Sequence, residues 1–319
     1  MPTGDPIPAF VNPTAGSAPT AREAIAKDPR FALREVAPLQ LPDALRAEVA
    51  RGTPRVVVAG GDGTVTLAAR ALAGTDTALA VLPGGTLNHF ARDLGLPTDD
   101  AAACLECAVR GTVRPVDAAT LNGELFLNTS SAGAYVQFVR TRERIEAWHL
   151  GYRLATLLAT IWTWLRLHAF TVVVREGDRP GDAERQLRSP LVFVAVGERS
   201  LSPPAVGGRS PTGRRALQLM IVNTASRWGV IALVARMAAG GLDDVANDPA
   251  LDVSLVDACE LRMRRPWGRV AMDGELARLR APLHYRVAHD ALLAVVPPVE
   301  LAAGPFAAGG SAGGAASAG

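Results

Sequence analysis

The first third of the chain alternates short apolar runs with turns and helical patterns. Ile7–Val11, Val56–Ala59 and Ala78–Leu82 are continuous apolar runs, as expected for strands buried on both faces of a parallel sheet. Each run ends in a turn containing Gly or Pro, and helical patterns follow, one reaching Ala73 and another around Phe90. This alternation predicts a three-layer α/β domain.

The sequence pattern changes after about residue 120. Apolar, strand-like runs now follow one another, separated by Gly, Pro and Arg: Leu125–Thr129, Phe170–Val174, Leu191–Val196, Leu217–Val222 and Leu292–Val296. Such a succession predicts a β-rich second domain. We therefore expect an α/β domain over residues 6–119, a β-rich domain over 120–298 and a mostly disordered Gly/Ala/Ser tail over 299–319.

One helical segment interrupts the predicted strands, from Ile145 to His168. It carries Trp148, Tyr152, Trp162 and Trp164. Aromatic side chains in a helix usually pack in a core or between domains, which is the interpretation favoured here, although amphipathic rings also suit a membrane interface. The apolar stretch within it, residues 154–165, is shorter than the about 20 residues of a spanning helix, so no transmembrane segment is expected.

Composition and charge exclude several classes of function. The 33 basic and 31 acidic residues nearly balance, so no global field favours nucleic acid. Lys27 is the sole lysine and follows Ala26 in a polar stretch, which excludes a Walker A loop and argues against a protein-kinase or pyridoxal lysine. The start of the chain, residues 1–6, lacks the features of a signal peptide, and three cysteines are too few for a disulfide framework. A cytoplasmic protein is expected.

Two of the cysteines form a C-x-x-C pair, Cys104 and Cys107. They lie in an alanine-rich helical pattern, where a small buried side chain is the favoured interpretation over a redox or metal pair. Zinc would require four ligands, and Cys259 is distant in sequence.

The first motif with chemical meaning is Gly60-Gly61-Asp62-Gly63-Thr64. Its glycines permit tight backbone geometry, and N–H groups beside a helix N-terminus can bind an anion. Asp62 would repel bare phosphates, so it suits a Mg²⁺ ion that bridges them or the orientation of an attacking hydroxyl. A plain turn with Asp62 as a helix cap remains an alternative.

A second glycine turn, Gly84-Gly85-Thr86-x-Asn88, follows the next predicted strand. Neighbouring parallel strands would bring both loops to one sheet edge, where they could hold one nucleotide. The dinucleotide-binding fingerprint fits poorly, because Thr66 stands where its third glycine belongs and Pro83 ends the following strand.

These motifs resemble the diacylglycerol kinase catalytic-domain family, which includes sphingosine and ceramide kinases and bacterial lipid kinases. The resemblance rests on Asn12-Pro13 with Gly16, Gly60–Thr64, Pro83–Gly95 and Asp273-Gly274-Glu275, in family order from Phe10 to about Pro298. It implies a nucleotide-binding α/β domain, a C-terminal β-sandwich, and an active site in the cleft between them, where ATP meets a lipid hydroxyl.

The resemblance also implies roles for individual residues. Asp62 and Asp273 would serve the metal and phosphates, and Glu275 would be the general base that accepts the proton of the alcohol. Asp117 could complete a metal network with Asp62, and a solvent-facing aspartate after a proline bend explains it equally well. The expected nucleotide-binding residues are Asn12, Gly60, Gly61, Gly63, Thr64, Gly84, Gly85, Thr86 and Asn88. With only one lysine, arginine and backbone N–H groups would carry the remaining phosphate charge, and Arg92 is one such arginine.

Some positions depart from the family pattern or have another explanation. His89 stands where many relatives have an aspartate, and the acidic stretch before a late strand is replaced by Gly213-Arg214-Arg215-Ala216-Leu217. A structural metal found in some bacterial members is therefore in doubt, and the two arginines could face anionic lipid headgroups. Asp273-Gly274 is also a common hairpin turn.

The sequence thus predicts an ATP- and Mg²⁺-dependent lipid kinase that phosphorylates a membrane alcohol such as diacylglycerol. It would act at the membrane surface from the cytoplasm, without nucleic acid, and a homodimer is an open option. A catalytically silent lipid- or nucleotide-binding homologue is the alternative from another class. An NAD kinase is less favoured, because the Asn-Glu pair of that class is missing and the motif of residues 84–94 is present instead.

Overall fold

The computed structural model describes residues 5–146, 152–177, 181–182, 184–199, 208–210, 212–224, 226–240 and 248–298. The chain divides into two compact units, one of Met1–Pro115 with Leu292–Gly319 and one of Val116–Ala291. The domain boundaries expected from the sequence, 6–119, 120–298 and 299–319, stay a prediction, and the tail lies outside the described residues.

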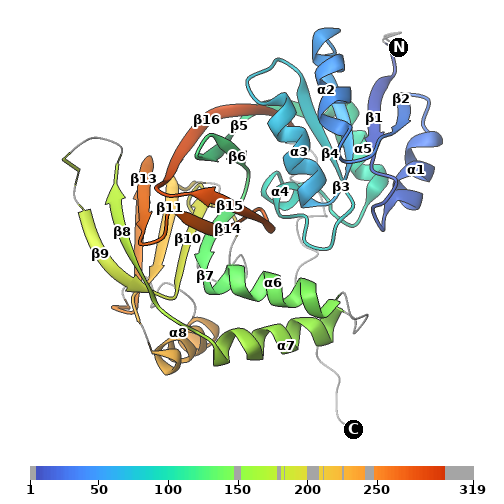
Figure 1. The fold of residues 1–319 in the computed structure, drawn as a ribbon. Helices are drawn as coiled ribbons and strands as arrows, with labels where there is room; N and C mark the ends of the chain where they lie inside the picture. Colours follow the sequence, from blue (N-terminus) through green and yellow to red (C-terminus); the bar gives the residue numbers. More distant parts are fainter. Residues whose placement is uncertain are drawn as a thin grey trace. The chain divides into compact units, whose positions relative to one another are not determined.

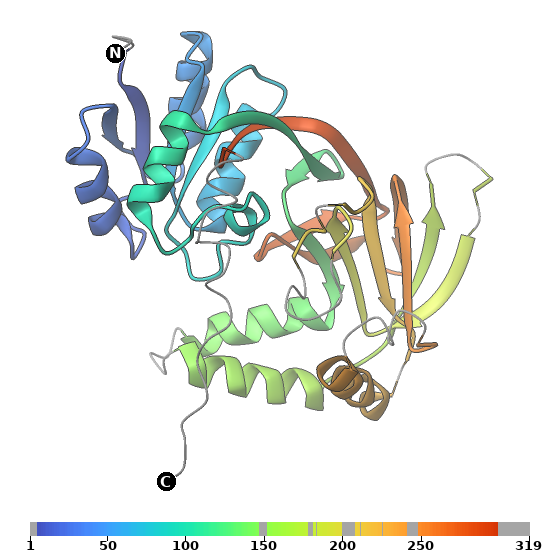
Figure 2. The same ribbon diagram turned by 180° about the vertical axis from the view of Figure 1, so that it is seen from behind.

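The first unit is an α/β domain, as predicted. Its parallel strands run in the order β2-β1-β3-β4, and Figures 1 and 2 show α2 and α3 on one face of the sheet and α1 and α5 on the other. The strands are β1 (Ile7–Val11), β2 (Phe31–Glu35), β3 (Arg55–Gly60) and β4 (Ala78–Pro83). The helices are α1 (Ala18–Ala26), α2 (Leu41–Ala50), α3 (Asp62–Leu72), α4 (His89–Asp93) and α5 (Ala101–Arg110).

Burial explains the apolar runs of this unit. Val56–Ala59 in β3 and Ala78–Leu82 in β4 are all buried, because helices cover both faces of a parallel sheet. In α5, Cys104 and Cys107 are free and buried, and burial raises the pKa of Cys104 to about 12 and that of Cys107 to about 11. Thiols with such values stay protonated at neutral pH, so the C-x-x-C pair is a packing feature, as expected.

The second unit is built from two sheets. In one, β9-β8-β13-β16 lie in order, and β5 pairs with β16 and β6; the other has the order β12-β11-β10-β7-β14-β15. The strands are β5 (Thr112–Leu121), β6 (Glu124–Phe126), β7 (Thr129–Gly133), β8 (Phe170–Glu176), β9 (Glu184–Ser189), β10 (Leu191–Val196), β11 (Leu217–Val222), β12 (Leu251–Val256), β13 (Ala258–Met263), β14 (Trp267–Met272), β15 (Glu275–Arg280) and β16 (Leu283–Val296). The helices are α6 (Ala134–Glu146), α7 (Tyr152–Leu165) and α8 (Arg227–Gly240).

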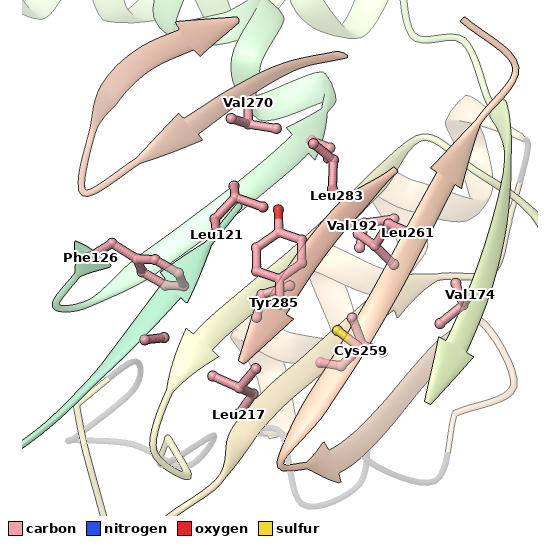
Figure 3. Packing of buried hydrophobic residues seen from close by; sticks show 14 of the residues in the cluster. Leu121, Phe126, Val174, Val192, Leu217, Cys259, Leu261, Val270, Leu283 and Tyr285 are labelled. Atoms are coloured by element: carbon pink, nitrogen blue, oxygen red, sulfur yellow. The ribbon is translucent and has the colours of Figure 1, made fainter. Parts of the chain in front are cut away.

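A shared apolar core joins the two sheets of this unit, which makes it a sandwich (Figure 3). Val174 and Leu261 come from one sheet, and Val192 and Leu217 from the other. Tyr285 lies fully buried among them, and its hydroxyl is 3.1 Å from the Ser130 hydroxyl. Because a buried phenol requires a hydrogen-bond partner, this pair fixes how β7 and β16 face each other.

Strand β16 contributes to both units along its length. Its earlier residues pair with β13 in the second unit, whereas Ala294 pairs in parallel with Leu79 of β4 in the first. Leu292, Ala294 and Val295 are almost completely buried. The predicted strand Leu292–Val296 is thus the end of a 14-residue strand.

Two predicted elements differ from the structure. The predicted strand Leu125–Thr129 is broken, since β6 ends at Phe126 and β7 begins at Thr129. The predicted helix Ile145–His168 is α7, with only its first residues falling in α6, and Trp148 lies outside the described residues. No helix in the described part of the chain is long and apolar enough to cross a bilayer.

Candidate functional site

The two glycine loops of the first unit meet, as the sequence predicts. They follow the paired strands β3 and β4, and Gly84 donates its N–H to the Gly60 carbonyl at 2.9 Å. A Cβ atom built on Gly85 would lie 2.8 Å from the Gly61 Cα, and one on Gly84 would lie 3.3 Å from the Gly60 Cα. Backbone therefore packs directly on backbone, which is the geometric reason for glycine at these positions.

Asn88 closes the second loop. It adopts the left-handed conformation, with φ of 49°, and its side chain exchanges two hydrogen bonds of 2.8 Å with the Gly85 backbone, one from the Gly85 N–H and one to the Gly85 carbonyl. Asn tolerates this conformation better than most residues. Its amide is thereby engaged in holding the loop, while the neighbouring Thr86 is exposed.

The turn after β1 contacts both loops through two polar side chains. Asn12 donates from Nδ2 to the Thr64 hydroxyl at 3.4 Å, and Ser17 donates its hydroxyl to the Gly84 carbonyl at 2.7 Å. Asn12 was predicted for this neighbourhood, whereas Ser17 was not. The available signal for Ser17 was a small hydroxyl residue between a Gly turn and a helix whose first residues include Pro19.

Asp62 is the first residue of α3, beside the junction of the two loops. Its side chain is half-buried and accepts one long hydrogen bond, 3.4 Å, from the Phe90 N–H. The first N–H groups of α3, including those of Gly63 and Thr64, have no acceptor within the helix and carry the positive end of its dipole. Five of the predicted nucleotide residues, Gly60, Gly61, Gly63, Gly84 and Gly85, thus surround one helix N-terminus.

Asp273 and Glu275 lie in the second unit, on a two-residue hairpin. Asp273 and Gly274, with φ of 48° and 90°, connect β14 to β15, and Met272 pairs with Glu275. The Asp-Gly pair is therefore the hairpin turn that the sequence allowed as an alternative. It places Glu275 at the exposed start of β15.

The Asp273 carboxylate has backbone partners that the sequence did not reveal. Its oxygens accept the N–H groups of Leu127, Asn128 and Thr129 at 2.8, 2.8 and 3.1 Å. These bonds lie at the break between β6 and β7. The carboxylate therefore accepts hydrogen bonds from N–H groups that would have paired with a neighbouring strand if the strand had continued unbroken. Asp273 therefore has a structural task, and its expected role toward metal and phosphate stays a prediction.

Asp117, expected near a metal, is held by an arginine. Arg215 binds its carboxylate at 2.8 and 2.5 Å and also contacts Asp290 at 2.6 Å. Burial favours the neutral acid, but the bonds from Arg215 and from the Asp290 N–H outweigh that effect and hold the Asp117 pKa below its usual range. Arg215 is thus paired within the protein rather than left for lipid headgroups, and the metal role of Asp117 stays a prediction.

No group of three or more His, Cys, Asp or Glu residues suited to a metal occurs among the described residues. A Mg²⁺ ion in the first unit would therefore rely on Asp62 together with phosphate oxygens and water, which is the usual way that this ion binds with a nucleotide. The Asp62 carboxylate fits that donor set, because its one protein hydrogen bond is long. His89 and Arg92 are exposed on the short helix α4 next to the loop.

Comparison with known proteins supports the resemblance found in the sequence. Residues 6–121 match the family described as diacylglycerol kinase catalytic domain. A Mycobacterium tuberculosis protein named Diacylglycerol kinase is 39% identical over 111 residues, covering 34% of this chain and 36% of that protein. A Pseudomonas aeruginosa protein named Probable lipid kinase YegS-like is 44% identical over 87 residues, covering 27% and 28%. The chain therefore spans about a third of the length of the M. tuberculosis relative.

Solved structures share the fold over nearly the whole chain. Two chains from Bacillus anthracis strain Sterne, described as diacylglycerol kinases, one of them provisionally, have TM-scores of 0.71 and 0.65. They are 22% and 19% identical, and each match covers 94% of this chain and 99% of the other. The likeness confirms the α/β unit followed by a sheet-rich unit.

Proposed function

We propose that this protein is an ATP- and Mg²⁺-dependent lipid kinase that transfers the γ-phosphoryl group to the hydroxyl of a lipid such as diacylglycerol. The observation that carries the proposal is the packing of Gly60-Gly61 on Gly84-Gly85 at the N-terminus of α3. Backbone N–H groups and a helix N-terminus form a site for phosphate that needs no lysine. The family match over residues 6–121 and the names of the relatives support the same activity.

In this proposal the first unit binds the nucleotide. The N–H groups at the start of α3 bind phosphate oxygens, and the close backbone packing prevents any side chain from filling their place. Asn12 and Thr64, linked at 3.4 Å, lie beside the first loop and would contact the nucleotide. Asn88 keeps the second loop in position through the Gly85 backbone.

Asp62 would hold Mg²⁺. When bound, this ion neutralises charge on the transferred phosphoryl group. A carboxylate at a phosphate site raises the free energy of a bare anion, so Asp62 makes nucleotide binding depend on the cation. The protein would then bind ATP weakly without divalent cations, unlike a site made of N–H groups alone.

Glu275 would accept the proton of the lipid hydroxyl. It is exposed at the start of β15, directly after the Asp273-Gly274 turn that joins β15 to β14. General bases contribute about 10²–10⁴-fold to such steps. For this to occur, Glu275 of the second unit would have to reach the phosphate loops of the first, and that juxtaposition is part of the proposal.

The experiment is phosphoryl transfer from labelled ATP to a panel of lipids in mixed micelles, with and without Mg²⁺. Diacylglycerol, monoacylglycerol, ceramide and sphingosine would serve as acceptors. Asp62→Asn should reduce turnover by about 10²-fold or more. Asp43→Asn is the matched control, because Asp43 also lies in the first turn of a helix of this unit, where it pairs with Arg46.

Full turnover of the Asp62→Asn protein would contradict the proposal. ATP binding without transfer to any lipid of the panel would instead favour the catalytically silent alternative. Formation of NADP from NAD would favour an NAD kinase.

A further inference from the structure

Helix α7 presents a stripe of large apolar side chains to solvent. Its exposed apolar residues are Leu154, Leu157, Leu158, Ile161, Trp162 and Leu165. They recur at intervals of three and one residues, so they lie along one face of the helix. Leu157 is 56% exposed, which shows that this face has no cover within the described part of the protein.

The opposite face of α7 is small and buried. Ala155 and Ala159 are fully buried and Thr163 nearly so, and Figures 1 and 2 show α6 lying alongside α7. A surface helix normally buries its large apolar side chains and exposes its polar ones. Helix α7 instead buries small side chains and exposes large apolar ones, so packing against the described part of this unit does not account for the exposed stripe.

Helix α8 extends the same apolar surface. The Trp228 ring packs edge-on against the Trp164 ring, with centroids 5.7 Å apart. Trp228 itself is 67% exposed, and Ile231, one turn further on, is also exposed. The α7 stripe together with Trp228 and Ile231 is called the α7–α8 surface below. Of the packing in a core or between domains expected for the aromatics of this segment, core packing does not hold for Trp162, which is exposed.

The charged residues within α7 and α8 are all arginines. Neither α7 nor α8 contains an Asp or Glu. The Arg166 guanidinium lies 4.0 Å from the centroid of the Trp162 ring, and Arg227 immediately precedes Trp228; both arginines are exposed. Apolar side chains with Trp and Arg at their margin are the composition of helices that lie in the interface of a bilayer.

We propose that the α7–α8 surface docks this protein on a membrane that contains anionic lipids. The apolar side chains would insert among the acyl chains near the headgroups, and Arg166 and Arg227 would meet lipid phosphates. With 14 residues, α7 spans roughly 21 Å, less than the about 30 Å of hydrocarbon, so it would lie in the interface. A symmetric dimer through this surface is disfavoured because it would bring basic residues against basic residues.

Vesicle binding tests the proposal in the absence of ATP and of any acceptor lipid. The full chain is sedimented with phosphatidylcholine vesicles and with vesicles in which about a third of the lipid is phosphatidylglycerol. We expect binding to the anionic vesicles, and Ile161→Glu should weaken it by about tenfold or more, since it places a charge where an apolar side chain inserts.

The matched control is Thr160→Glu. Thr160 is the sequence neighbour of Ile161 and is exposed, but it lies outside the apolar stripe, so the same added charge on the same helix should leave binding nearly unchanged. Replacing both Arg166 and Arg227 by Gln should weaken binding to anionic vesicles by about fivefold per arginine and leave binding to neutral vesicles unaltered. Thermal melting of each variant checks that the fold is retained.

Three outcomes would overturn the proposal. The first is that the wild-type protein binds neither kind of vesicle. The second is that Ile161→Glu and Thr160→Glu weaken vesicle binding equally. The third is that the wild type is a dimer in solution that Ile161→Glu converts to a monomer. The proposal is independent of the kinase activity, because vesicle binding is measured without turnover. Conversely, transfer to a short-chain, water-soluble acceptor would survive Ile161→Glu if the proposed function is right.

Discussion

Single residues in and near the two glycine loops differ in how much change the structure allows. Gly85 faces the backbone of Gly61, and a Cβ atom there would lie 2.8 Å from a Cα that cannot rotate away. Gly16, in the turn after β1, has nothing within 4 Å of a built Cβ. An added methyl group would therefore clash with backbone at Gly85 but would have open space at Gly16, although both glycines belong to the motifs that carry the family resemblance.

Gly85→Ala should separate the two loops. We expect a loss of about 1–3 kcal/mol in the free energy of unfolding, because the backbone must move, and at least a tenfold weaker affinity for ATP with Mg²⁺. Gly16→Ala should change neither the free energy of unfolding nor the affinity for ATP. Denaturant unfolding and calorimetric titration measure the two quantities, and equal effects of the two substitutions would contradict the packing argument.

Two glutamates occupy equivalent positions on two hairpins of this protein. Asn122 and Gly123 form a turn with φ of 51° and 90°, like that of Asp273 and Gly274, and Glu124 follows it at the exposed start of β6. Glu275→Gln should lower turnover with saturating ATP and lipid by about 10²-fold or more if it is the base. Glu124→Gln should leave turnover unchanged, and a similar loss in both would mean that hairpin stability, rather than proton transfer, is measured.

At the scale of elements, carboxylates join strands that are distant in sequence. Asp273 binds three N–H groups between β6 and β7. Asp273→Ala should destabilise the second unit by about 3 kcal/mol or more, because hydrogen bonds to a charged group contribute about 1.5–3 kcal/mol each and buried N–H groups would be left without acceptors.

Asp273→Asn should cost less than Asp273→Ala, since Asn keeps one acceptor oxygen and tolerates the left-handed backbone. Urea denaturation of both variants measures the difference. If neither substitution alters stability while both abolish turnover, the carboxylate acts in chemistry rather than in holding the strands.

The Asp117–Arg215 pair joins β5 to the segment before β11 and gives stability a pH dependence. The folded pKa of Asp117 is depressed, so the pair stabilises the fold above the unfolded pKa of about 3.9 and loses that contribution as the pH falls through the lower, folded value. Asp117→Asn should therefore melt at a lower temperature than the wild type at pH 7. The difference between the two melting temperatures should narrow below about pH 4. A difference that is constant from pH 7 to pH 3 would contradict this account.

Over the whole molecule, the last residues of β16 belong to the first unit, although the strand begins in the second. The last residues of β16 pair with β4, and the Leu292 and Val295 side chains are buried there, contributing roughly 2 kcal/mol each. A chain ending after Ala291 should lose ATP binding and the cooperative melting of the first unit. A chain ending after Pro298 should keep both, as calorimetry and ATP titration can show.

Patterns local to the chain predicted much of the strand and loop arrangement. Apolar runs predicted β1, β3, β4, β10 and β11 closely, because strands that are largely buried are mostly apolar; Gln218 in β11 is buried but accepts a hydrogen bond from the Arg199 N–H. The glycine motifs predicted two loops at one sheet edge, since neighbouring parallel strands share that edge and only glycine permits such close backbone contact. Strands exposed on one side, such as β9 and β15, carry polar residues that obscure the pattern.

Contacts between residues far apart in the chain could not be predicted in this way. Three hydrogen-bonded pairs show this. The Asp273 carboxylate binds N–H groups between β6 and β7, Arg215 binds Asp117, and Ser17 donates to the Gly84 carbonyl, and each pair lies 67 or more positions apart in sequence. No local propensity encodes such pairs. The exposure of the α7 stripe is of the same kind: the periodicity of an amphipathic helix fixes that its two faces differ, whereas packing against the rest of the unit decides which face is left to solvent.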